Sequence, residues 1–337
     1  MPAWRRTALG CALILACSTA AAAPFALATN QEANSLSVID LATQQVTKEI
    51  PIPGGPVGIA IGRDAQRIFV TTPTNHAIAV IDAATWEIVK TIAVTGEVLG
   101  IAADPVRDRI YAAAWYERKI WAIDSRTLKL VGDFPAGNIP AGLAVTRDGK
   151  LLVVANRDDN SISIIDLVQG ITRTQVKVGN APFGVTLNAA GTRAFVANVK
   201  SNTVSVVDLA AAHTIATIQV GEAPYASALD ARRQYLWVTN EQAGTVSVVD
   251  LARNHEITRI KTGEYPEGIA FESTNDRVYV ASWFDNRLDI LDPVRYTVIG
   301  RIACANGTRA FGDFILYPRP STPPAPPRDN PHRPGAN

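Results

Sequence analysis

Residues 182–223 read PFGVTLNAAGTRAFVANVKSNTVSVVDLAAAHTIATIQVGEA, and this stretch holds one complete repeating unit of the chain. Four short runs, GVTL, AFVAN, TVSVVD and TIATIQV, are separated by turn-forming residues such as those at 188–191 and 200–202. Apolar and polar residues alternate in TVSVV, which is typical of a strand and not of the three-to-four-residue spacing of a helix. We therefore predict four antiparallel strands per unit, the number found in a propeller blade.

The unit recurs along the chain with a constant period. An Asp ends the third run of each copy and returns every 42 residues, without insertion or deletion, as Asp40, Asp82, Asp124, Asp166, Asp208, Asp250 and Asp292. An apolar, mostly large residue recurs in the second run as Phe69, Tyr111, Val153, Phe195, Trp237 and Tyr279. A fixed period of this length is the signature of a repeat architecture. The sequence thus predicts an all-β, seven-bladed β-propeller.

The two ends of the repeat predict how the ring closes. The first Asp-ended run, SLSVID, is preceded by FALAT but by no inner strand, whereas residues 311–317 look like an inner strand without the rest of its blade. We expect a composite blade with one strand from the C-terminus and three from the N-terminus, because closure covers sheet edges that an open array exposes. The propeller is assigned to residues 24–317.

Two copies end their second run with a recognisable motif. Trp237-Val-Thr-Asn240 and Phe195-Val-Ala-Asn198, with the PxG turn and the terminal Asp, resemble the YVTN family of bacterial β-propellers over about residues 25–317. No Trp-Asp pair closes the strands, so a WD-repeat protein is a poorer match. The resemblance implies the fold, with single-stranded nucleic acid or envelope proteins as partners. Propellers host unrelated activities, so the resemblance does not decide the function.

The N-terminal segment resembles an export signal, and the C-terminal segment a tail. Arg5 and Arg6 precede an apolar run followed by small residues, so residues 1–23 are interpreted as a signal peptide cleaved between Ala21 and Ala23. The alternative is lipidation of Cys17, because ILAC resembles a lipobox. Residues 318–337 are rich in proline and are expected to form an extended or disordered tail. The protein is therefore expected in the periplasm or otherwise outside the inner membrane.

Composition gives few signs of cofactor or catalytic chemistry. The full chain has 32 basic and 31 acidic residues, and removal of Arg5 and Arg6 with the signal leaves 30 against 31, which gives no electrostatic case for strong non-specific nucleic-acid binding. There is no CxxCH motif, and the single Met is the first residue. The repeated Asp residues are interpreted as turn acceptors instead of metal ligands, because they lie on separate blades. No catalytic residue, metal ligand or cofactor is predicted.

The positions that vary between copies predict a binding face. The loops between the second and third runs carry two rings of residues, which are Gln31, Pro73, Trp115, Arg157, Val199, Glu241 and Trp283, and beside them Glu32, Thr74, Tyr116, Asp158, Lys200, Gln242 and Phe284. Nearer the axis we expect Val57, Leu99, Ala141, Phe183, Tyr225, Glu267 and Arg309. A scaffold that repeats while its loops vary is typical of a binding site on rigid elements.

Aromatic and Arg residues stand out on this face. Trp115-Tyr116 and Trp283-Phe284 occupy the same loop position four blades apart, hence on nearly opposite sides of the channel mouth. The candidate ligand-binding residues are these four with Arg118, Arg157, Phe183, Tyr225, Arg287 and Arg309. Exposed aromatics beside Arg suit stacking and cation–π contacts with a planar group. The alternative is that the loop aromatics fold down and cap neighbouring blades.

Two classes of function follow. The first is an exported binding or scaffolding module whose ligand is a small molecule, single-stranded nucleic acid or an envelope protein. The second is a periplasmic enzyme or an accessory subunit of a redox system, because propellers resembling this one include lactonases and carriers of haem or quinone. The scarcity of His and Met and the scattered carboxylates of the loop face favour the first class.

Overall fold

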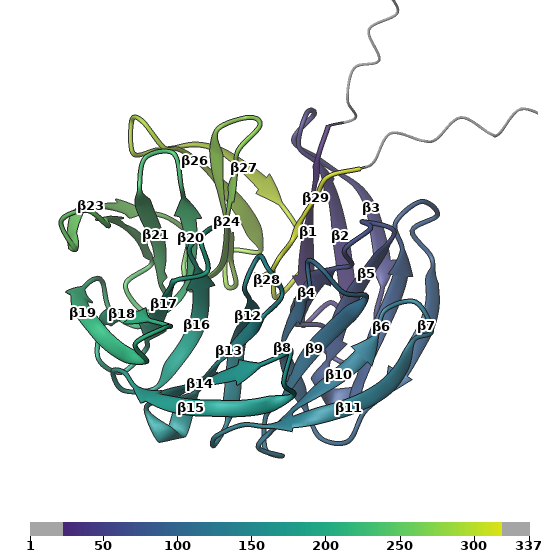
Figure 1. The fold of residues 1–337 in the computed structure, drawn as a ribbon. Helices are drawn as coiled ribbons and strands as arrows, with labels where there is room; N and C mark the ends of the chain where they lie inside the picture. Colours follow the sequence, from purple (N-terminus) through teal and green to yellow (C-terminus); the bar gives the residue numbers. More distant parts are fainter. Residues whose placement is uncertain (1–22, 319–337) are drawn as a thin grey trace, which may run out of the picture.

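The computed structural model describes residues 23–318, which form a ring of seven antiparallel sheets around a central channel (Figure 1). In six blades the four strands follow one another in chain order from the axis outward. The first three of these blades contain β4 (Gly58–Ile61), β5 (Arg67–Thr72), β6 (Ala77–Asp82) and β7 (Ile88–Ala93); β8 (Val98–Ala103), β9 (Arg109–Ala114), β10 (Lys119–Asp124) and β11 (Lys129–Pro135); and β12 (Pro140–Val145), β13 (Leu151–Asn156), β14 (Ser161–Asp166) and β15 (Ile171–Lys177). The next three contain β16 (Pro182–Leu187), β17 (Arg193–Asn198), β18 (Thr203–Asp208) and β19 (His213–Gln219); β20 (Pro224–Asp230), β21 (Tyr235–Asn240), β22 (Thr245–Asp250) and β23 (His255–Lys261); and β24 (Pro266–Glu272), β25 (Arg277–Ser282), β26 (Arg287–Asp292) and β27 (Thr297–Ala303). Two 3-10 turns, η1 (Pro73–Asn75) and η2 (Arg157–Asp159), lie in loops between second and third strands. The predicted seven-bladed propeller is confirmed.

The seventh blade is composite, with strand order β29 (Ile315–Leu316), β1 (Phe25–Asn30), β2 (Ser35–Asp40) and β3 (Gln45–Pro51). The expected single closing strand is divided in two, because β28 (Phe311–Gly312) first pairs in parallel with β4 of the next blade. Gly312 has a φ of +110°, a left-handed value that favours glycine. The chain then crosses to β1, where Ile315 pairs with Ala26 and Leu316 with Phe25.

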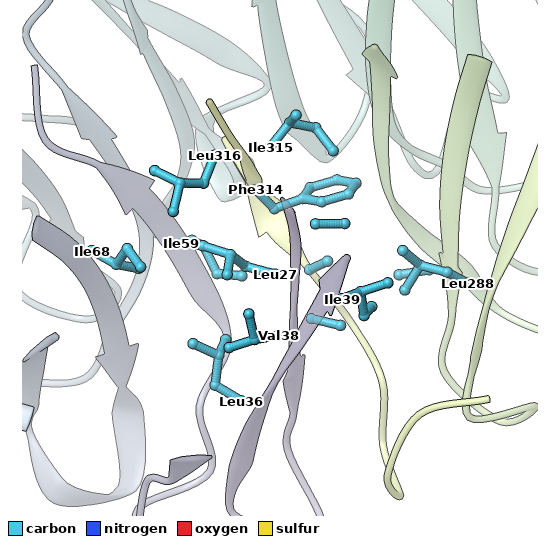
Figure 2. Close-up of a cluster of buried hydrophobic side chains, with 14 of the residues drawn as sticks. Leu27, Leu36, Val38, Ile39, Ile59, Ile68, Leu288, Phe314, Ile315 and Leu316 are labelled. Carbon is cyan, nitrogen blue, oxygen red and sulfur yellow. The ribbon is translucent and has the colours of Figure 1, made fainter. Parts of the chain in front are cut away.

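Apolar side chains gather where the two ends of the chain meet (Figure 2). Phe314 is completely buried and belongs to one cluster with Leu27 and Leu36 of the N-terminal strands and with Leu288 of β26. The cluster therefore joins the composite blade to both neighbouring blades. Residues 1–22 and 319–337, with most of the predicted signal and tail and with Cys17, lie outside the described residues.

Each blade packs against the next through the predicted large residues. Phe69, Tyr111, Val153, Phe195, Trp237 and Tyr279 are all buried, which confirms that they fill the space between blades. Near the axis the inner strands approach each other closely, because a Cβ at Gly100 or Gly268 would lie 2.0 Å from the carbonyl oxygen of Ala141 or Ala310. In the described part of the chain, no helix is long and apolar enough to span a membrane.

The repeated Asp residues are turn acceptors, as predicted. In all seven copies one carboxylate oxygen accepts hydrogen bonds from the backbone N–H groups two and three residues later. At Asp208 the donors are Ala211, at 2.8 Å, and Ala210, at 3.0 Å, and they lower the pKa of the carboxyl below its ordinary value.

Asp208→Ala should lower the melting temperature at pH 7 by about 2 °C, because the turn loses both acceptor contacts. A carboxyl whose pKa is lowered by folding stabilises the fold above its unfolded pKa, and the stabilisation is lost as the pH falls through the folded pKa. The difference from wild type should therefore shrink at pH 2–3. Asp133→Ala removes an exposed Asp on β11 with no hydrogen bond or ion pair among the described residues and serves as the control. An equal loss in both variants would contradict the turn assignment.

Candidate functional site

One end of the ring, called here the loop face, is built from the loops between second and third strands and from those that lead into the inner strands. Trp115 and Tyr116 follow β9, and Trp283 and Phe284 follow β25, so the two aromatic pairs occupy equivalent places four blades apart. Trp115 and Trp283 are half-buried, whereas Tyr116 and Phe284 are 64% and 54% exposed. Each pair thus has one ring packed on the scaffold and one in solvent.

Below the rim, aromatic rings fill this end of the channel. Phe183 and Tyr225 stack with centroids 4.1 Å apart, and Phe311 contacts both at 5.3 and 5.6 Å. Trp115 packs on Phe183 at 5.9 Å. The expectation that Phe183 and Tyr225 are exposed is wrong: they are 6% exposed, because the inner strands direct them toward the axis, where they exclude water from one another.

Arg309 is also buried, contrary to expectation, and lies in a polar network below the rim. Its guanidinium makes a bidentate pair with Glu267, with Nη2 donating to Oε1 at 2.8 Å and Nε donating to Oε2. It also donates to the Tyr225 hydroxyl at 3.1 Å and to Gln31 Oε1 at 2.8 Å. Its Cζ lies 4.8 Å from the Trp283 ring centroid. Arg309 is therefore held by partners from three blades and is not presented to solvent.

The network sets the ionisation of the groups around it. Burial raises the pKa of Glu267, and Arg309 counteracts this. For Arg309 burial opposes the charge, but the Glu267 carboxylate more than compensates, so the pKa of Arg309 is raised. Burial, with the nearby negative charge of Glu267, also raises the pKa of the half-buried Glu241 to about 7. The pKa of Glu241, on the loop face, is thus close to neutral pH.

The other Arg residues of the predicted site lie in different environments. Arg157 pairs with its neighbour Asp158 at 2.6 Å, and Arg287 pairs with Asp285 at 3.1 Å and Asp289 at 3.0 Å, so both charges are neutralised locally. Arg118 is exposed and has no ion pair within the described residues. The structure therefore brings Trp115, Phe183, Tyr225, Trp283 and Arg309 into one connected group around the channel. Outside this group, Arg118 and Arg157 lie in loops and Arg287 begins β26.

A hollow lies beside Trp115 on the loop face. Its volume is about 390 Å³, and it is lined by Gln31, Val57, Pro73, Thr74, Glu97, Leu99 and Trp115. Six of these residues belong to the rings picked out from the repeat, whereas Glu97, next to the inner-strand turn, was missed. The Glu267–Arg309 pair was also missed, although both residues occupy the same ring position, 42 residues apart. Comparing charges between adjacent copies could have found it.

Groups suited to metal or thiol chemistry are scarce in residues 23–318. No set of three or more His, Cys, Asp and Glu side chains there is arranged to hold a metal ion. Burial raises the pKa of the Cys304 thiol to about 12, so its reactive thiolate form is suppressed. The Asn side chains at positions 30, 156, 198 and 240 each donate to two hydroxyls of the adjacent third strand, which makes them structural.

This fold, a closed propeller with varied loops on a repeated scaffold, supports a binding or scaffold module. The family model described as YNCE-like beta-propeller matches residues 15–105 and 101–193, more than half of the 337-residue chain. The chain therefore belongs to the YNCE-like β-propeller family, to which the YVTN resemblance is close.

Solved structures also share the fold, whereas a search of curated proteins finds no match. A chain of hydrazine synthase from Kuenenia stuttgartiensis is 18% identical with a TM-score of 0.68, over 75% of this chain and 88% of that one. A functionally unknown protein from Desulfotomaculum acetoxidans DSM 771 is 14% identical with a TM-score of 0.75, over 86% and 99%. At these identities the likeness concerns the fold alone.

Proposed function

We propose that the protein is an exported binding module that holds an apolar or aromatic segment of an envelope protein on its loop face. The observation that carries the proposal is the pair of exposed rings, Tyr116 and Phe284, on opposite sides of the channel mouth. Each exposed ring is backed by a half-buried Trp, at 6.5 Å for Trp115 and 5.4 Å for Trp283. Aromatic anchors on a rigid base are typical of the residues that dominate binding energy.

The charge around these rings favours a protein over a nucleic acid. Arg157 and Arg287 are paired with carboxylates, Arg309 is buried, and Glu97 lines the hollow beside Trp115. A phosphate backbone needs an accessible row of cations, because release of counterions supplies most of its affinity. Apolar contact with a segment of protein needs no such row. No observation on the described residues favours the enzyme or redox-subunit hypothesis.

The buried residues beneath the loop face also support a binding role. Phe183, Tyr225 and Phe311 pack tightly beneath the rim, and the Arg309 network ties the same end of the channel to Gln31 and Glu267. A partner would thus meet rings that lose little freedom on binding, which reduces the entropic cost of association. The hollow of about 390 Å³ beside Trp115 offers a place for one inserted side chain.

Aromatic substitutions test the proposal directly. A peptide panel rich in Trp, Tyr and Phe, screened by thermal shift against the mature protein, supplies the ligand, because a ligand that binds only the native state raises its stability. Tyr116→Ala and Phe284→Ala should each weaken binding of the best peptide by about 1–3 kcal/mol, and Trp115→Ala and Trp283→Ala by at least as much. Only the two Trp variants should also lower the melting temperature, since only the Trp rings are half-buried.

Val294→Ala is the matched control, because Val294 is 64% exposed, as Tyr116 is, but lies in a loop between third and fourth strands on the opposite face. It should leave binding unchanged. If Tyr116→Ala and Phe284→Ala bind as wild type does while Val294→Ala does not, the loop face is excluded and the opposite face carries the site. Preferential stabilisation by oligonucleotides over peptides would favour a nucleic-acid ligand.

A further inference from the structure

The channel contains a second cavity, separate from the loop face. It has a volume of about 390 Å³ and is lined by the middle and far ends of the inner strands β8, β12, β16, β20 and β24 and by residues 311–313. Phe311 lies at its boundary with the aromatic cluster, since it touches both Phe183 and Tyr225 and also lines the cavity. Most of the wall is small and apolar, with Ala102, Ala144 and Ala270 among its residues.

Asp313 is the single ionisable side chain in the lining of this cavity. The side chain is accessible to water within the channel, and it has no ion pair in the described part of the chain. Burial by the surrounding blades raises the pKa of Asp313 to about 6, although the Ile315 N–H, which donates to the carboxyl, opposes the shift. No charged neighbour contributes to this shift. At neutral pH the cavity therefore holds mainly an ionised carboxylate without a counter-charge.

No other blade carries a carboxylate at the position equivalent to Asp313. The positions that precede Asp313 by multiples of 42 residues are all apolar, namely Ile61, Ala103, Val145, Leu187, Leu229 and Phe271. An acidic side chain that is partly desolvated and has no ion pair opposes folding at neutral pH. Groups that lower stability without a compensating counter-charge are typical of functional sites.

Two hydroxyl groups make part of the cavity wall polar. Thr186 Oγ1 donates to the carbonyl oxygen of Ser227 at 2.7 Å and lies 2.8 Å from Ser227 Oγ. Both residues line the cavity, and they are its remaining polar side chains. The site thus combines one anion, two neutral hydroxyls and an apolar wall, and its volume lies within the range of about 300–1,000 Å³ that small-molecule pockets occupy.

We infer that this cavity binds a small organic cation, a primary ammonium group on a short apolar body. The ammonium would lie against the Asp313 carboxylate, and the hydrocarbon would cover the Ala-rich wall. Charge-assisted hydrogen bonds to a carboxylate are stronger than neutral ones, and they gain further where water is partly excluded. The inference stands independently of the function proposed for the loop face.

Titration calorimetry with hexylammonium at pH 7.5 tests the inference, with hexan-1-ol as the neutral analogue. Wild type should bind the cation at least tenfold more tightly than the alcohol, and Asp313→Asn should lose at least tenfold in affinity for the cation. Asp133→Asn, which removes an exposed carboxylate on β11, should bind as wild type does. Absence of hexylammonium binding to wild type at millimolar concentration, or equal affinity in Asp313→Asn, would overturn the inference.

The pH dependence and the stability of the variant supply two further readouts. The cation affinity should fall about tenfold between pH 7.5 and pH 5, because protonation of Asp313 removes the negative charge while the amine stays charged. The pKa of Asp313 is raised by folding, so its ionised form costs stability above the unfolded pKa. Asp313→Asn should therefore melt at or above the wild-type temperature at pH 7.5. A pH-independent affinity would also contradict the inference.

Loop-face variants separate this site from the proposed function. Tyr116→Ala and Phe284→Ala should leave hexylammonium binding unchanged, because both rings lie in exposed loops outside the cavity lining. Conversely, Asp313→Asn should not alter binding of an aromatic peptide to the loop face. Loss of hexylammonium binding in the loop-face variants would place the cation at the rim and refute the cavity site.

Discussion

A chain that ends at Ala310 should fail to form a stable ring, whereas a chain that ends at Pro318 should melt as the full-length protein does. The shorter chain loses β28 and β29, the strands that pair with β4 and β1 and join the C-terminus to the first blades. The longer one keeps every contact of the described residues. The measurement is thermal unfolding followed by circular dichroism, with size-exclusion chromatography to detect aggregation through exposed sheet edges.

The magnitude follows from burial. Phe311, Phe314, Ile315 and Leu316 are each 6% exposed or less. Burying one such side chain stabilises a protein by about 1.5–3 kcal/mol, so four together approach the total stability of about 5–15 kcal/mol of an ordinary domain. If the closing strands contributed little to the stability of the ring, the two truncated chains would have the same melting temperature. The composite blade would then not be what closes the ring.

A single substitution gives a milder version of the same test. Phe314→Ala removes a completely buried ring and should cost about 3–5 kcal/mol, the usual loss for a buried Phe. Phe284→Ala removes the same ring from a position that is 54% exposed and should change the free energy of unfolding by less than about 1 kcal/mol. Similar losses in the two variants would show that Phe314 does not hold the closure.

The fold could be predicted almost completely because the same sequence pattern occurs in every blade. Seven copies of an Asp-ended strand give the blade number, and the surplus inner strand at residues 311–317 indicates how the ring closes. The break in that strand could not be predicted in this way. It depends on the parallel pairing of Phe311 and Gly312 with β4, which involves residues about 250 positions apart and has no counterpart in the other blades.

The candidate site was predicted by position but not by environment. The register placed Phe183, Tyr225 and Arg309 correctly near the axis, yet all three are buried and form a floor, not a contact surface. Alignment of copies gives the height of a residue on its blade, whereas burial depends on the side chains that enter the channel from the other blades. For the same reason, alignment of the copies could not identify Asp313 as a site residue, because its surroundings are built by inner strands of five other blades.

The ion pair beneath the rim should be the most sensitive polar element of the molecule. Glu267 is completely buried and Arg309 is 8% exposed, so removal of either partner leaves a charge without compensation in a poorly hydrated place. Breaking a buried pair in this way costs about 3–5 kcal/mol. We expect that loss in urea unfolding for both Glu267→Leu and Arg309→Met. The exposed pair Arg157–Asp158, on the same face, provides the control, and Arg157→Met should cost less than about 1 kcal/mol.

The double variant separates the pair from its surroundings. When Glu267→Leu and Arg309→Met are combined, no buried charge is left unpaired, so the double variant should be more stable than either single variant. A loss that equals the sum of the two single losses would show that Glu267 and Arg309 act independently. Added salt should not change the effect of the buried pair but should reduce that of Arg157, because screening acts on exposed charges. Tyr225 and Gln31 also accept hydrogen bonds from Arg309, so some loss should remain in the double variant. That remaining loss would measure how firmly the Arg309 side chain joins the closing segment to the blades it crosses.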